Sequence, residues 1–315
     1  MSQEVERYLH AATRANTRRS YRAAIEHYEV SWGGLLPATA EAVARYLAEH
    51  AGSLSANTLR LRLAALSQWH ASQGFPDPTR APLVRQVLKG IRALHPRQEK
   101  QAEPLQLREL EQCVNWLEDN AGRARAEGDT AVLLRSLRDR ALLLIGFWRA
   151  FRSDELCRLR VEHIRARAGE GMQLFLPWSK GDRDNQGRTF SAPALARLCP
   201  VQAYLEWVDA AGLAEGPVLR SVDRWGRLGT SALHPGSVIP LLRAVLRGAG
   251  LPAELYSSHS LRRGFATWAS RSGWDQKALM SYVGWRDANS ALRYVEPHGS
   301  FPGQLQPAPE PPLVP

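Results

Sequence analysis

The chain of 315 residues is long enough for about two domains, and its 44% hydrophobic and 23% charged residues are typical of folded globular proteins. Lys and Arg outnumber Asp and Glu by 41 to 31, and the resulting formal charge of +10 favours a polyanionic partner such as nucleic acid. The longest apolar run, residues 141–148, is too short to span a bilayer, and the polar N-terminus does not read as a signal peptide. We therefore expect a cytoplasmic protein without a membrane partner.

Residues 1–95 are expected to form a helical domain. Helices are predicted from about Asn16 onward, in AEAVARYLAEH, in SLSANTLRLRLAALSQWHASQG and in APLVRQVLKGIRAL. In the third, Ser55 or Asn57 can cap the start and Gly74 ends the helix. One stripe of that helix is expected to be buried: Leu59, Leu63, Leu66 and His70. The opposite faces of the domain are expected to project arginines: Arg18, Arg19, Arg22, Arg60 and Arg62.

Residues 96–104 are polar and lack periodicity, so they read as a linker between domains. A larger domain, again mostly helical, is expected over residues 105–297. Its strand region MQLFLPW, the turn-rich SKGDRDNQG and then RTFSAP predict a β-hairpin with Lys180 at or near its turn. Residues 298–315 are rich in proline and are expected to be an extended tail. The predicted fold class is mainly α with a small β-hairpin.

The three cysteines, Cys113, Cys157 and Cys199, are widely spaced and form no CxxC pair. We interpret them as small buried residues of a protein in a reducing compartment. The sequence therefore predicts neither a metal site nor a cofactor.

Five short segments of the second domain contain side chains suited to phosphate chemistry: GFWRAFRSDELCRL with Arg152 and Glu155, the hairpin with Lys180, HSLRRGFAT with His259 and Arg262, VGW with Trp285, and ALRYVEP with Tyr294. Taken singly, each has an ordinary structural explanation. Arg152 and Glu155 could form a surface ion pair, and Trp285 could be a core aromatic residue. It is the combination that indicates a function, because short motifs alone match by chance.

In this order, Arg, Lys, His-x-x-Arg, Trp and Tyr resemble the catalytic signature of the tyrosine recombinase, or phage integrase, superfamily. The Trp is typical of Cre-like members, where many relatives have a second His. The resemblance covers most of the chain. SANTLRLRLAALSQWHASQGFPDPT and VRQVLKGIRAL are similar to the family's helical, SAM-like core-binding domain. LLLIGFWRAFRSDELCRLRVEHI, SKGDRDNQGRTFSAP and SHSLRRGFATWAS are similar to its first-arginine region, lysine hairpin and His-x-x-Arg helix.

The resemblance implies a site-specific recombinase that cleaves and rejoins DNA through a covalent 3′-phosphotyrosyl intermediate. Tyr294 would be the nucleophile, and the phosphotyrosyl bond would conserve the energy of the phosphodiester without ATP or metal. Lys180 would protonate the departing 5′-oxygen, and Glu155 would orient the first-arginine region. The remaining residues would donate to the non-bridging oxygens, which gain negative charge in the transition state: Arg152, Arg262, His259 and Trp285.

The resemblance also implies contacts with double-stranded DNA. The polar residues near two helix starts of the first domain are similar in position to the family's major-groove readers, and a further contact is expected in the second domain: Asn16, Arg19, Asn57, Arg60 and Arg243. The expected partners are short inverted-repeat sites, bound by a dimer on one site and a tetramer on two. No additional arm-binding domain is apparent.

The tail departs from the Cre-like pattern, in which a C-terminal helix enters a neighbouring subunit. Seven prolines from Pro297 onward exclude a helix of useful length. We expect the tail to dock on a neighbouring subunit as an extended peptide, with Phe301 and Leu305 as anchors.

Two other functions remain open at the level of sequence. Type IB topoisomerases use the same chemistry and would relax supercoils as monomers, and a relative with an inactive site would only bind DNA. Trapping a covalent adduct, and asking whether exchange needs two copies of a site, would distinguish the three functions.

Overall fold

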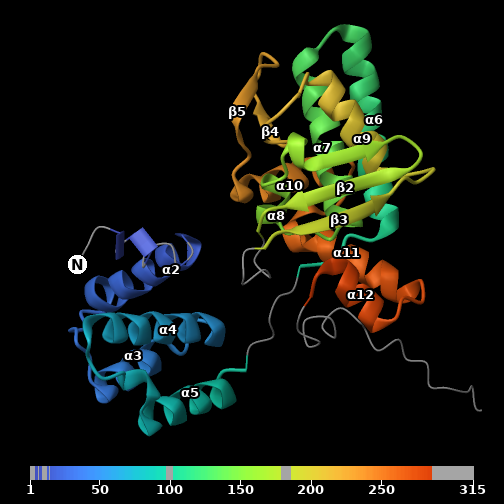
Figure 1. Ribbon diagram of the computed structural model, residues 1–315. Helices are drawn as coiled ribbons and strands as arrows, with labels where there is room; N and C mark the ends of the chain where they lie inside the picture. Colours follow the sequence, from blue (N-terminus) through green and yellow to red (C-terminus); the bar gives the residue numbers. More distant parts are fainter. Residues whose placement is uncertain are drawn as a thin grey trace, which may run out of the picture. The chain divides into compact units, whose positions relative to one another are not determined.

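The computed structural model describes residues 4, 5, 7, 8, 13, 15–96, 102–178 and 186–285, with the elements shown in Figure 1. The chain divides into two units, and the boundary lies between residues 100 and 101. Both units are mainly helical, in agreement with the predicted fold class. Within the described residues, none of the helices has the length and apolar character required to cross a membrane.

The first unit contains the four helices predicted from apolar spacing. They are accompanied by a π-helix and a 3-10 turn, in the order α2 (Ala15–Glu26), η1 (His27–Ser31), α3 (Ala40–His50), α4 (Ala56–Gln73), η2 (Pro78–Arg80) and α5 (Pro82–Leu94). The buried core is formed mainly by side chains of η1, α3, α4 and α5, including Tyr28, Val43, Tyr46, Leu47, Leu59, Leu66, Val84 and Ile91.

Helix α4 shows how local sequence signals set the limits of an element. Ser55, rather than Asn57, is the N-cap, and its Oγ accepts a hydrogen bond from the backbone N–H of Thr58 at 3.0 Å. Gly74 ends the helix with a φ of 75°, a conformation that favours glycine. His70 is fully buried, as predicted, and its Nε2 accepts from the N–H of Ala38 at 2.8 Å. Its Nδ1 therefore carries the proton and donates to the carbonyl of Leu66 at 2.7 Å.

The second unit combines seven α-helices with two small sheets within the described residues. The helices are α6 (Leu107–Glu127), α7 (Thr130–Trp148), α8 (Ser153–Cys157), α9 (Pro200–Ala210), α10 (Val238–Gly248), α11 (Ser258–Arg271) and α12 (Gln276–Val283). The strands are β1 (Ile164–Arg167), β2 (Gly171–Leu176), β3 (Arg188–Pro193), β4 (Arg220–Val222) and β5 (Leu228–Ala232). Short 3-10 turns connect them: η3 (Val161–His163), η4 (Pro235–Ser237) and η5 (Ala253–Leu255).

The predicted hairpin is confirmed as the antiparallel pair β2–β3, whose register runs from Gly171 opposite Pro193 to Leu176 opposite Arg188. Strand β1 adds to the other edge of β2, and it was not predicted. Burial alternates along β2, so one face of the sheet packs on the core and the other is open. The two-stranded sheet β4–β5 was also not predicted.

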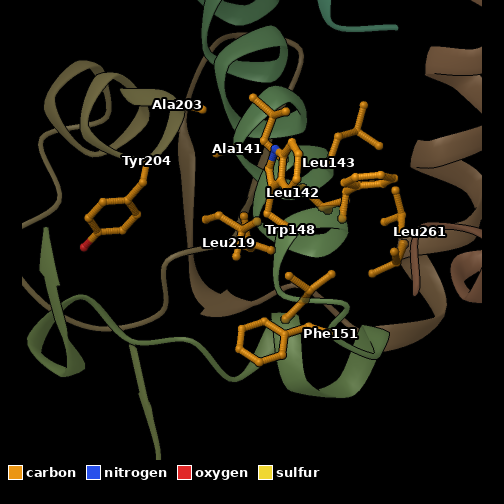
Figure 2. Close-up of a cluster of buried hydrophobic side chains, with 14 of the residues drawn as sticks. Ala141, Leu142, Leu143, Trp148, Phe151, Ala203, Tyr204, Leu219 and Leu261 are labelled. Carbon is orange, nitrogen blue, oxygen red and sulfur yellow. The ribbon is translucent and has the colours of Figure 1, made fainter. Parts of the chain in front are cut away.

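Helix α7 forms the centre of the second core. From Ala141 to Trp148 every residue is buried, as expected for a helix that is apolar on all sides. Figure 2 shows Leu142, Leu143 and Trp148 of this helix together with Phe151 and Leu261. The end of α7 is thus fixed by packing on every side, and the first predicted catalytic residues follow directly after it.

Candidate active site

The turn from α7 into α8 positions Arg152. Ala150 adopts a φ of 50°, an uncommon conformation for a residue other than glycine. The N–H of Phe151 donates to the carbonyl of Gly146 at 3.2 Å, which closes the end of α7. Arg152 is then the N-cap of α8. The side chain of Arg152 is partly exposed, at 31%.

Glu155 is the carboxylate around which the site is organised. It is 5% exposed, and its Oε2 accepts from the backbone N–H of Arg152 at 2.8 Å. Its Oε1 accepts from Nη1 of Arg152 at 2.9 Å. The same side chain therefore caps α8 and holds the arginine, which is more than the surface ion pair considered from sequence. Its Oε2 also lies 4.0 Å from Nη1 of Arg262.

Helix α11 carries Arg262 one turn after His259, as predicted. Arg262 is 3% exposed, and its Nη1 donates to the carbonyl of Ala150 at 2.6 Å. His259 is exposed on the first turn of α11, where its backbone N–H donates to Oγ of Ser257 at 3.2 Å. Gly264 allows the backbone of Leu105 to lie against the helix, since a Cβ there would overlap that carbonyl. The backbone N–H of Leu105 also donates to the carbonyl of Ser260 at 3.0 Å, one turn earlier on the same helix, so Leu105 helps to fix α11.

Trp285 completes the described part of the site. It follows Gly284, which ends α12 with a φ of 77°, and its N–H donates to the carbonyl of Met280 at 2.9 Å. The indole is 8% exposed, and Cζ of Arg262 lies 5.1 Å from the ring centroid. Arg262 is therefore held between the carbonyl of Ala150 on one side and an aromatic ring on another.

The structure thus brings together Arg152, Glu155, Arg262 and Trp285, which are separated by up to 133 positions in the sequence (285 − 152). Lys180 and Tyr294 lie outside the described residues, as do Phe301 and Leu305 of the tail. The predictions for these four residues therefore rest on the sequence.

Arg149 is a further residue of this region, which the sequence reasoning missed. Its guanidinium is buried and donates to the carbonyls of Ser191 on β3 (2.8 Å) and Tyr282 on α12 (2.7 Å). Its Cζ lies 3.8 Å from the centroid of the Tyr282 ring, and burial lowers its pKa from the ordinary value. Arg149 therefore ties the turn before Arg152 to the sheet and to the helix that precedes Trp285. The sequence signal was present, since GFWRAFR contains two arginines, but nothing in it distinguishes the buried one.

The candidate DNA-reading residues of the first unit lie where a partner could contact them. Asn16 and Arg19 are exposed on α2, and Asn57 and Arg60 are exposed on the first turns of α4. Nη1 of Arg60 donates to Oδ1 of Asn57 at 3.1 Å, so these two side chains form one polar group.

Two other arginines differ from the expectation of freely projecting side chains. The prediction for Arg62 is wrong: its Nε and Nη1 are buried, and the side chain interacts with Tyr46 in the core. Arg243, the expected contact in the second unit, has 34% of its side chain exposed. Its Nε donates to the carbonyl of Tyr256 at 3.3 Å, and its Nη1 lies 3.2 Å from Oε2 of Glu254.

Cys199 also departs from the expectation of three buried cysteines. Cys113 and Cys157 are buried, and burial raises the pKa of each thiol to about 12. Cys199 is only partly buried, and its Sγ caps α9 by accepting from the N–H of Gln202 at 3.4 Å.

Comparisons with known proteins identify similar integrases and recombinases. The phage integrase family model matches residues 233–299, a stretch that includes the positions of His259, Arg262, Trp285 and Tyr294. An integrase/recombinase xerD homolog from Selenomonas ruminantium is 29% identical over 271 residues, which cover 84% of this chain and 76% of the relative. The recombinase cre of Escherichia phage P1 is 24% identical over 288 residues, covering 85% of this chain and 79% of that one.

Solved structures share the fold. The integrase of transposon Tn1549, in complex with transposon right-end DNA, superposes with a TM-score of 0.62 at 15% identity and 94% coverage of both chains. The XerH site-specific recombinase bound to palindromic difH substrate, in a post-cleavage complex, superposes with a TM-score of 0.57 at 17% identity, covering 88% of this chain and 75% of that chain. The chain is thus similar to proteins of the tyrosine recombinase, or phage integrase, superfamily over most of its length. The relatives are named as integrases and recombinases, so the alternative of a type IB topoisomerase is not favoured.

Proposed function

We propose that this tyrosine recombinase cleaves and rejoins DNA at specific sites through a covalent 3′-phosphotyrosyl intermediate on Tyr294. The observation that carries the proposal is the convergence of Arg152 and Arg262 on one buried carboxylate, Glu155, with Trp285 packed against Arg262. Two planar guanidinium groups held on one carboxylate form a preorganised cationic site for a phosphodiester.

The two arginines act on the non-bridging oxygens of the scissile phosphate. These oxygens gain negative charge as the nucleophile attacks, so donors that are already in place stabilise the transition state more than the ground state. Glu155 holds both arginines in place by pairing with each of them. The side chain of Arg152 remains 31% exposed, so it can still contact a phosphate. Arg152→Lys is expected to be severely impaired although it retains the charge, because a forked contact becomes a point contact.

Tyr294 and Lys180 carry the bond changes. The phenolic oxygen of Tyr294 loses its proton and attacks phosphorus, the bond from phosphorus to the 5′-oxygen breaks, and Lys180 donates a proton to that oxygen. Rejoining reverses these steps with the 5′-hydroxyl of the partner strand. A 5′-bridging sulfur needs no proton to leave, so it is expected to rescue Lys180→Ala largely.

Trp285 and His259 supply further donors toward the phosphate. Trp285→His retains an N–H and is expected to keep appreciable activity. Trp285→Phe retains an aromatic ring beside Arg262 but lacks the donor, and cleavage is expected to fall by about 100-fold. Equal activity of the Phe and Trp enzymes would show that the residue only packs.

The partner is double-stranded DNA, and we propose short inverted repeats bound by a dimer on one site and a tetramer on two. The charge of +10 supports a DNA partner. Exposed Asn16, Arg19, Asn57 and Arg60 are suited to base edges in the major groove. Alanine variants of base-reading residues are expected to relax specificity at one position by about 1–3 kcal/mol, whereas loss of a phosphate contact weakens all sequences alike.

A nicked duplex containing a site selected from random DNA tests this function. Cleavage next to the nick releases a short fragment, so the covalent adduct accumulates and can be measured on a denaturing gel. A site-specific recombinase forms the adduct only on the selected sequence and exchanges strands only between two copies. Relaxation of supercoiled DNA without a selected site, with no exchange between two sites, would support the topoisomerase alternative instead.

A further inference from the structure

We infer that Arg158 and Trp178 form a clamp that ties the chain after β2 to the end of α8 and thereby limits the positions open to Lys180. Arg158 and Trp178 are not members of the catalytic signature. The inference rests on the proposed role of Lys180 as the proton donor, and it assigns the two residues a positioning role rather than a catalytic one.

The contact between the two side chains is close. Cζ of Arg158 lies 3.1 Å from the centroid of the Trp178 ring. Nη2 of Arg158 also pairs with Oδ1 of Asp154 at 2.9 Å, one turn earlier on α8. Its Nη1 is buried and has no hydrogen-bond partner within the described residues, as expected for a nitrogen that faces an aromatic ring. A guanidinium plane stacks on an indole well, and an ammonium group does not reproduce this geometry.

The contact matters because Trp178 lies close to Lys180 in the sequence. The paired register of β2 and β3 ends at Leu176 opposite Arg188, so Trp178 lies two residues beyond the last strand pair. Trp178 is also two residues before Lys180 in the sequence. Two residues of extended chain span at most about 7 Å, so an anchor at Trp178 restricts the region that Lys180 can reach.

Arg158, the other residue of the clamp, directly follows the helix whose N-cap is Arg152. Helix α8 has only five residues, Ser153–Cys157, with Arg152 as its N-cap and Arg158 directly after its last residue. The backbone N–H of Arg158 donates to the backbone carbonyl of Glu155 at 3.3 Å, and the side chain of Glu155 holds Arg152. Residues 152–158 therefore include both Arg152, proposed to contact the non-bridging oxygens, and Arg158, which anchors the chain that leads to Lys180.

The test compares cleavage of a normal phosphodiester with cleavage of the same site carrying a 5′-bridging sulfur. The variants are Trp178→Ala and the milder Arg158→Lys, and Trp225→Ala is the control. Trp225 is also stacked by a neighbouring arginine, with Cζ of Arg224 at 4.5 Å from its ring, but it lies between β4 and β5. For Trp178→Ala we expect normal cleavage to fall by about 10- to 100-fold, the size of effect that loss of positioning produces. Arg158→Lys is expected to show a smaller loss of the same kind.

The bridging-sulfur substrate separates positioning from general structural damage. If the clamp acts through Lys180, this substrate restores both variants to within about threefold of the unmodified enzyme, since its leaving group needs no proton. Trp178→Ala added to Lys180→Ala should then cause no further loss on the normal substrate. Trp225→Ala should leave both rates unchanged. Equal losses on the two substrates, or an additive loss in the double variant, would overturn the inference.

Lys180→Ala alone distinguishes the inference from the proposed function. If the sulfur substrate does not rescue Lys180→Ala, the proton-donor role is wrong and the clamp has no catalytic target. If it rescues Lys180→Ala but not Trp178→Ala, the proposed function stands and the clamp is rejected.

Discussion

Removing the carboxylate of Glu155 is expected to damage both stability and catalysis. In Glu155→Ala, the backbone N–H of Arg152 loses its acceptor, at a cost of about 1 kcal/mol. Arg262, which is 3% exposed, loses its counter-charge at 4.0 Å. Breaking a fully buried pair costs roughly 3–5 kcal/mol, but Arg152 is 31% exposed and its share must be discounted. We expect a total of about 3 kcal/mol for Ala, and about half of that for Glu155→Gln, which retains an acceptor.

Urea unfolding followed by tryptophan fluorescence measures the stability, and adduct formation on a nicked site measures catalysis. Glu170→Ala is the matched control, because Arg167 and Glu170 have the same i,i+3 spacing but are 80% and 67% exposed at 3.5 Å. That variant should change stability by less than about 0.5 kcal/mol. Glu155→Gln should form adduct at least about tenfold more slowly than the unmodified enzyme while still binding DNA. If Glu155→Ala and Glu170→Ala behave alike in both assays, the organising role of Glu155 is wrong.

Two further predictions follow from the packing and charges. Gly264→Ala should destabilise the protein by about 3 kcal/mol or more, because the added Cβ would meet the backbone of Leu105. Gly122 lies in open space on α6, so Gly122→Ala should stabilise the protein by about 0.5–1 kcal/mol. Thermal unfolding that ranks the two variants otherwise would contradict this. Burial and the charges of Arg62 and His50 lower the pKa of His27 below 6.5, so the unfolded chain takes up the proton first as the pH falls. Unfolding free energy should therefore decrease between about pH 7 and 5, and less so in His27→Gln; equal slopes would exclude this linkage.

The sequence was most informative where a local signal also determines the fold. Ser55 and Gly74 delimit α4, and the turn-rich segment between MQLFLPW and RTFSAP predicted a hairpin that is present as β2–β3. Strand β1 reads IRAR and is half polar, because the sheet is open on one face, so its pairing comes from tertiary contacts rather than from its own sequence.

Within the candidate site, the resemblance predicted Arg152 and Arg262, but the sequence could not reveal how they are held. The 4.0 Å approach of Glu155 to Arg262 joins residues that are 107 positions apart (262 − 155). Ala150 supplies the carbonyl for Arg262 through a left-handed backbone that an alanine rarely adopts and that no residue pattern signals. The burial of the Arg62 guanidinium also depends on a tertiary contact, with Tyr46. From sequence alone, an arginine on a helix is expected to be exposed.

Identification of the residue that becomes linked to DNA tests the central claim most directly. The adduct formed on a nicked site would be digested with protease and nuclease, and the peptide carrying the residual nucleotide sequenced by mass spectrometry. We expect one modified peptide, with the nucleotide on Tyr294, and no adduct from Tyr294→Phe although that variant still binds the site. A nucleotide on any other residue, or an undiminished adduct from Tyr294→Phe, would contradict it.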